Sequence, residues 1–173
     1  MEAIAELKLQ YLLIKLGFGN IQVCIDWAVE RLQLNQEGGD LDVVLLAGST
    51  KYDEAFPLVG KIVLKYASID SKDEELAAGK LIANLYKDYK SGIESIDSLD
   101  SKLTKLDYSL DHPDWLLMLS RNCEYATDID VFREPFEQEF SYIAELWASS
   151  ATHSEFESKY SRAVSNGHDA KYC

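Results

Sequence analysis

Apolar side chains recur at helical spacing along almost the whole chain, and this pattern constrains the fold more than any other feature. Ile4, Leu7, Tyr11 and Ile14 are separated by three, four and three positions, which places them on one face of a helix. Only 3 prolines and 9 glycines interrupt the 173 residues. The pattern therefore predicts an all-α protein, a single-domain bundle of about eight helices.

Local signals indicate where several of these helices begin. Asn20 is a residue type that caps helix N-termini with its side-chain oxygen. The pairs Ser71–Glu74 and Thr152–Glu155 each have the spacing of a capping box, in which two side chains satisfy free backbone N–H groups. We therefore expect helices to start at these three places.

The length of one apolar run and the length of the whole chain bear on the secondary structure of that run and on the number of domains. The apolar run over residues 43–47 ends at Gly48, and a buried helix is expected there in preference to a strand, although so short a run does not decide between them. A chain of this length fits one domain. We expect a single helical domain over residues 1–167 and a frayed tail over residues 168–173.

The net charge of −13 restricts the partners of the protein. Residues 1–90 carry 14 acidic and 10 basic side chains, whereas residues 91–160 carry 15 and 5. A polyanion would be repelled by this charge, so we expect neither nucleic acid nor an anionic membrane as partner. The excess negative charge of the second half is better suited to a cationic protein.

Compartment and chemistry are also constrained. No apolar run approaches the roughly 20 residues that cross a bilayer, and the first residues are acidic where a secretory signal is basic. Three cysteines, Cys24, Cys123 and Cys173, form neither a disulfide framework nor a zinc pattern. We expect a cytoplasmic protein. Because no catalytic motif, metal-ligand spacing or phosphate-binding loop is present, we expect no enzyme activity, no metal and no cofactor.

An acidic stripe marks the helix expected over residues 93–110. Asp97, Asp100, Asp107 and Asp111 fall within one narrow sector of it, and no Lys or Arg stands three or four positions from any of them. Such like charges repel by a few tenths of a kcal/mol per pair. Two interpretations stay open: a solvated face that is balanced by lysines of the first half, or a surface for a cationic partner.

The helix expected over residues 132–147 has one unusual acid. Its apolar face is formed by Phe132, Phe136, Phe140, Ile143 and Trp147. Glu134 and Glu137 lie opposite, but Glu139 projects towards the phenylalanine side. A buried carboxylate is costly unless it is paired. Either Glu139 forms an internal ion pair, with Arg121 or Arg133, or it lies at the edge of an interface and binds a cation of the partner.

Two stretches resemble a known family. Residues 20–32 contain the pair Trp27-Ala28, and after a loop the segment Leu45-Leu46-Ala47-Gly48 follows. This order is similar to the N-terminal part of small helical bacterial immunity proteins that are encoded beside polymorphic toxins, including those of contact-dependent growth inhibition systems. Residues 130–147 fit the helical C-terminal half of such proteins.

The resemblance implies a non-catalytic protein that binds a cognate toxin domain in the cytoplasm and blocks its active site. Such toxins are often basic nucleases, which an acidic inhibitor would complement. The residues expected to contact the partner are Asp97, Asp100, Asp107, Asp111, Asp114, Glu134, Glu137 and Glu139.

Two alternatives stay open. A helical accessory or scaffold subunit of a cytosolic complex would bind through apolar contacts, and it would show an exposed aromatic patch and salt-insensitive association. A helical enzyme with an acid site would show a strongly perturbed carboxylate, with Glu139 as the first candidate.

Overall fold

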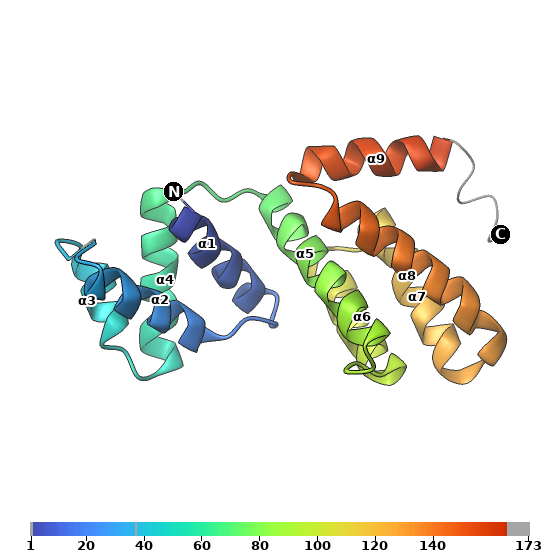
Figure 1. Cartoon of the computed structure of the whole chain (residues 1–173), viewed down its shortest axis with the longest axis horizontal. Coiled ribbons are helices and arrows are strands. Elements are labelled where there is room, and N and C mark those ends of the chain that lie inside the picture. Colours follow the sequence, from blue (N-terminus) through green and yellow to red (C-terminus); the bar gives the residue numbers. More distant parts are fainter. Residues whose placement is uncertain (1, 37, 166–173) are drawn as a thin grey trace. The chain divides into compact units, whose positions relative to one another are not determined.

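The computed structural model describes residues 2–36 and 38–165, and within these ranges all regular structure is helical (Figure 1). The all-α prediction is confirmed, with nine α-helices and one short 3-10 helix in the described residues, where about eight helices were expected. The described residues form two compact units, and the boundary between the units falls between Glu74 and Glu75. A single domain over residues 1–167 stays a prediction, and the expected tail at 168–173 lies outside the described residues.

The first unit packs four helices around a core of aliphatic side chains and one tryptophan. They are α1 (Glu2–Lys15), α2 (Ile21–Gln33), α3 (Leu41–Ala47) and α4 (Tyr52–Tyr66). The core includes Leu7, Cys24, Trp27, Val43, Leu46, Val59, Ile62 and Val63. Burying a large apolar side chain contributes roughly 1.5–3 kcal/mol, so this core is what stabilises the unit.

The first unit confirms the predicted cap of α2 and corrects the prediction for the run at 43–47. The Asn20 side chain accepts a hydrogen bond from the Gln22 N–H at 2.9 Å, as expected of an N-cap. Residues 43–47 are helical, but α3 buries only one face. Val43 and Leu46 are buried, whereas Leu41, Val44 and Leu45 are exposed. The run is uniformly apolar, so its sequence could not show which side faces the core.

Among the described residues, the second unit contains the longest helix and most of the contacts between aromatic rings. Its helices are α5 (Ser71–Lys90, which begins before the boundary), α6 (Ile96–Ser109), α7 (Asp114–Asp128), the 3-10 helix η1 (Asp130–Phe132), α8 (Arg133–Ala148) and α9 (His153–Ser165). In Figure 1, α5 to α8 run alongside one another and α9 crosses at one end of α8. Helix α7 packs against both α6 and α8.

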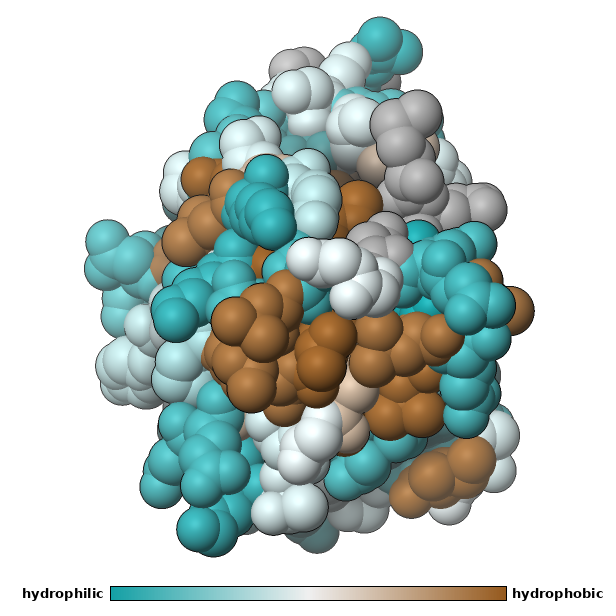
Figure 2. Space-filling view, turned by 90° about the vertical axis from the view of Figure 1, so that its left-hand side faces the viewer, coloured by the Kyte–Doolittle hydropathy of each residue, from teal (hydrophilic) through white to brown (hydrophobic). Residues whose placement is uncertain are grey.

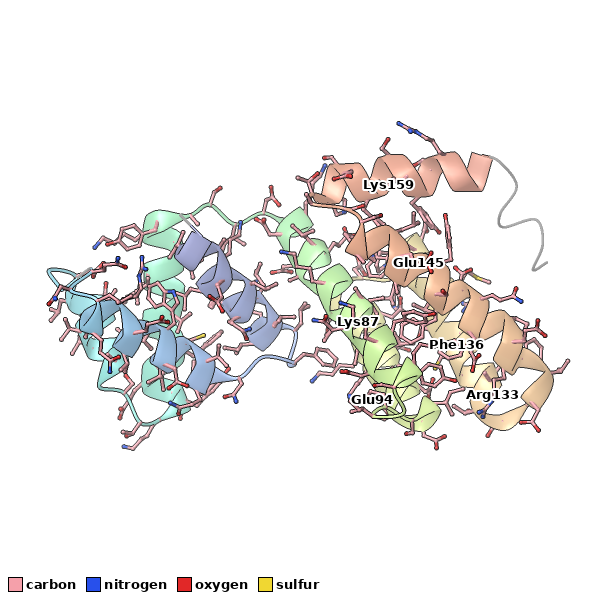
Figure 3. All side chains as sticks on the ribbon, in the orientation of Figure 1. Lys87, Glu94, Arg133, Phe136, Glu145 and Lys159 are labelled. Atoms are coloured by element: carbon pink, nitrogen blue, oxygen red, sulfur yellow. The ribbon has the colours of Figure 1, made fainter. Side chains whose placement is uncertain are left out.

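Aromatic rings join α5, α7, α8 and α9. Trp147 of α8 and Phe156 of α9 stack with ring centroids 3.6 Å apart, and Trp115 of α7 meets both rings edge-on. Figure 3 shows Phe136 directed from α8 towards α5, where its centroid lies 6.1 Å from that of Tyr89. The phenylalanine face predicted for α8 is buried, except that Phe132 precedes the α-helix and is exposed.

The two predicted capping boxes differ in outcome. At α9, Thr152 Oγ1 accepts a hydrogen bond from the Glu155 N–H, while Glu155 accepts one from the N–H of Ala151. At α5 the reciprocal bonds form one position earlier than predicted, between Asp70 and Asp73. Aspartate caps a helix as well as serine does, so Asp70 takes the role that the spacing predicted for Ser71.

Candidate functional site

The predicted acidic stripe on α6 does not form one continuous surface. Leu99, Leu103 and Leu106, which are separated by four and three positions and therefore share one face of α6, are all buried. Of the acids, Asp97 is exposed and Asp100 is half-buried. Asp107 is buried, with 6% of its surface exposed. A helix that packs on a protein core buries a stripe about 100° wide. Asp107 lies close enough to the leucine face of α6 to fall within the buried stripe.

Asp111 lies beyond the end of α6. Its φ angle is +60° and that of His112 is +58°, a left-handed conformation that Asp and His adopt more readily than most residues. The His112 N–H donates to the Asp107 carbonyl at 2.9 Å, which closes the helix with a Schellman-type turn. The turn brings the His112 ring back over α6, where Nδ1 lies 2.7 Å from Oδ2 of Asp107.

A groove of about 370 Å³ surrounds this Asp107–His112 pair, and Ser120 and Arg121 of α7 also line it. Ser120, His112 and Asp107 are the residue types of a Ser-His-Asp catalytic triad. Within the described residues, however, no hydrogen bond joins Ser120 to His112. The arrangement therefore lacks the contact that would activate the serine, and it gives no support for nucleophilic catalysis.

Glu124 and Asp128, two exposed acids of α7, lie near Asp97 and Asp100 of α6. Burial raises the pKa of Asp100, and the neighbouring charges of Glu124, Asp97 and Asp128 raise it further. All the charged groups that act on Asp100 are thus acidic. Its Oδ1 atom is buried and has no hydrogen-bond partner. We call Asp97, Asp100, Glu124 and Asp128 the α6–α7 acidic cluster.

Sequence reasoning missed Glu124 and Asp128, although a signal for them existed. They are four positions apart and therefore share one face of α7. The short link after Ser109 also favours antiparallel packing of α6 on α7. Only the rotation of α7 about its axis, which the core residues Leu116, Leu119 and Cys123 set, brings that face beside Asp97 and Asp100.

The predicted acids of α8 have three different environments. Glu134 is exposed and accepts a hydrogen bond from Gln138. Glu137 accepts one from the Tyr89 hydroxyl at 2.7 Å; burial and this bond raise the pKa of Tyr89 to about 12. Glu139 is 7% exposed, so it faces the core as its position in the helix predicted. The carboxylates of Glu139 and Asp107 do not lie on the surface.

Asp114, the remaining predicted residue, lines a separate pocket of about 470 Å³ between α7 and α9. It begins α7, directly after Pro113, which occupies the N-cap. The residues that line the pocket include both aromatic rings and carboxylates. The structure therefore divides the eight predicted residues among the α6–α7 cluster (Asp97, Asp100), the Asp107 groove, the turn after α6 (Asp111), the α8 surface (Glu134, Glu137), the helical core (Glu139) and this pocket.

The first unit carries a surface of a different kind. The exposed apolar side chains of α3 and α4 are Leu41, Val44, Leu45, Tyr52, Leu64 and Tyr66. Figure 2 shows apolar side chains gathered on this face of the unit. Leu41 and Leu64 are 68% and 66% exposed. Contiguous apolar surface of this kind is typical of a contact site for another protein.

Within residues 2–36 and 38–165, no group of three or more His, Cys, Asp or Glu side chains could hold a metal ion. None of the helices in these ranges combines the length and apolar character needed to span a membrane.

Comparisons of the chain with protein-family models, with curated proteins and with solved structures give no match.

Proposed function

We propose that this chain is a non-catalytic binding protein that neutralises a cationic protein partner in the cytoplasm, and that the partner is a toxin domain encoded beside it. The observation that carries the proposal is the buried, unpartnered Oδ1 atom of Asp100 among three other carboxylates. A carboxylate oxygen in such a place costs free energy unless a donor reaches it. A Lys or Arg of the partner would supply both the donor and the missing charge.

Charge supports the same function. The α6–α7 acidic cluster draws its members from two packed helices, which hold them in place before binding. Complementary charge speeds the encounter of two proteins and disfavours wrong partners. A basic toxin domain, whose substrate cleft is cationic, would be covered by such a surface and lose access to its substrate.

The test uses protection of living cells. The toxin domain of the neighbouring gene is expressed with this chain, with the variant Asp97→Lys/Asp128→Lys, or with the control Asp130→Lys/Glu145→Lys. All four positions are exposed acids and both variants change the net charge equally, but only the first pair belongs to the cluster.

We expect the chain and the control to restore growth and the cluster variant to lose protection. The purified cluster variant should associate with the toxin at least about tenfold more slowly at low salt, and the difference should shrink at high salt. Equal loss in the two variants, or no binding of the toxin to the unchanged protein, would contradict the proposal.

A second candidate function is favoured by the apolar surface on α3 and α4. An accessory subunit of a cytosolic complex would bind through such a surface, with little dependence on salt. The variant Leu41→Gln/Leu45→Gln should then release the partner without unfolding the protein, since both side chains are at least half exposed. Release by this variant but not by Asp97→Lys/Asp128→Lys would favour the subunit.

A further inference from the structure

The pocket between α7 and α9 combines two kinds of wall. Trp115, Phe156 and Tyr160 supply aromatic rings, and Glu75, Asp114 and Glu157 supply carboxylates. No lysine or arginine lines the pocket of about 470 Å³. Aromatic rings beside carboxylates are the surroundings in which proteins bind organic cations, because ring faces and carboxylates both attract positive charge.

One carboxylate of the pocket is held rigidly. The indole Nε1 of Trp115 donates a hydrogen bond to Oε2 of Glu75 at 3.0 Å. Nε2 of His153 lies 3.2 Å from the same oxygen. The other oxygen, Oε1, receives no hydrogen bond from the described residues. Glu75 is thus oriented by two ring nitrogens and keeps one oxygen for a ligand.

His153 is the second indication of a ligand. It lines the pocket with only 8% of its surface exposed, and its Nδ1 has no hydrogen-bond partner. Glu157 Oε2 lies 3.4 Å from Nδ1, without the geometry of a hydrogen bond. Buried polar atoms are normally satisfied. An unsatisfied one in the wall of an open pocket indicates that the pocket is built around a polar group.

We propose that this pocket binds the guanidinium group of an arginine side chain of the protein partner. Guanidinium is planar and stacks on aromatic rings, and its forked N–H groups match carboxylate oxygens. Ammonium lacks both properties. That the arginine belongs to a protein rests on the proposed function; the binding of guanidinium itself rests only on the pocket.

The test is a titration of the full-length protein, labelled with ¹⁵N and followed by NMR. The probes are N-acetyl-arginine amide, its neutral isostere N-acetyl-citrulline amide, and agmatine, which carries guanidinium without peptide groups. The reporters are the indole N–H of Trp115 and the backbone amides of residues 153–161. The variant Glu157→Gln removes an exposed carboxylate of the pocket, and Glu134→Gln removes one exposed charge of α8 outside it.

We expect the arginine probe to shift these signals with saturation in the millimolar range, on the order of 1–10 mM for an isolated side chain. Citrulline should give no saturable shift. Glu157→Gln should weaken binding about three- to tenfold, and Glu134→Gln should leave it unchanged.

Three results would overturn the inference. They are equal binding of citrulline, no saturable shift up to ~50 mM arginine probe, and equal weakening in the two variants. Tighter binding of agmatine than of N-acetyl-arginine amide would mean that the ligand of the pocket is a small free cation and not an arginine side chain of a protein. If the protein binds the arginine probe but does not protect cells from the toxin, the guanidinium pocket is supported and the proposed function is contradicted. If it protects cells but does not bind the probe, the proposed function is supported and the guanidinium pocket is contradicted.

Discussion

The ring of Trp147 fills the space in which any residue other than glycine at position 79 would carry its side chain. A Cβ atom on Gly79 would lie 2.1 Å from Cδ2 of Trp147. Real Cβ atoms do not approach other atoms so closely, and Trp147 is itself packed against Phe156 and Trp115. The glycine is therefore what allows α5 and α8 to approach each other.

We expect Gly79→Ala to lower the free energy of unfolding by about 1–3 kcal/mol, the usual effect of overpacking a core. Helix propensity alone predicts the opposite sign, because alanine is favoured over glycine by about 1 kcal/mol inside a helix. Thermal unfolding followed by circular dichroism measures the effect. Gly48→Ala is the control, since its Cβ would have no neighbour closer than 3.7 Å. A Gly79→Ala protein as stable as the control would contradict the packing described.

Asp100 should lower stability in the free protein. Burial and three acidic neighbours raise its pKa, so the ionised form is disfavoured in the folded state. This penalty is fully present above the folded pKa, shrinks as the pH falls through it, and is gone below the usual value of about 3.9. We expect Asp100→Asn to stabilise the protein at pH 7 by about 0.5 kcal/mol or more, and to bind the cationic partner less well.

Denaturant titrations of wild type and Asp100→Asn at pH 7 and at pH 4 measure the effect. The stability difference should be larger at pH 7. Glu134→Gln, an exposed acid on α8, controls for the loss of one charge. A destabilised Asp100→Asn protein at pH 7 would mean that the carboxylate has a stabilising partner.

Asp40 should have the opposite pH dependence. Its Oδ2 atom accepts hydrogen bonds from Lys65 Nζ at 2.7 Å and from the Tyr66 hydroxyl at 2.6 Å, and its Oδ1 caps α3. The bonds from Lys65 and Tyr66 lower the pKa of Asp40. The stabilisation is then fully present above about pH 3.9 and is lost as the pH falls through the lower, folded-state value.

We expect Asp40→Asn to destabilise the protein at pH 7, because an amide cannot replace the ionised acceptor, and to do so less as the pH falls below about 4. Asparagine still caps a helix, so Asp40→Ala should cost about 1 kcal/mol more. Denaturant unfolding of both variants measures the contribution of the ion pair to stability separately from the contribution of the helix cap. A pH-independent difference between wild type and Asp40→Asn would rule out the ionised acceptor.

The two described cysteines should not react in the native protein. Cys24 and Cys123 are fully buried, and burial raises the pKa of each thiol to about 12. Only the thiolate is a nucleophile. In the variant Cys173→Ser, we expect no labelling by a disulfide reagent at pH 8 and labelling of both thiols after denaturation. Rapid labelling of the native variant would show that a core opens readily.

The helical content and the core could be predicted because they depend on local spacing. Leu99, Leu103 and Leu106 recur at the helical period and are all buried, and the same reasoning placed Glu139 towards the core. Helical spacing alone could not predict that Asp107 is buried, or that Leu41 and Leu45 of α3 are exposed. Those outcomes depend on how wide a stripe each helix buries, which its neighbours determine.

What the sequence by itself determined is the set of helices, most of the residues that each turns inwards, and the excess of negative charge in the second half. These follow from short-range geometry and from composition. Only the tertiary structure decided where that charge acts. It joined Glu124 and Asp128 to Asp97 and Asp100, and it brought Glu75, Trp115 and His153 together from three helices. Contacts between distant segments depend on the rotation and packing of whole helices, which no local pattern encodes.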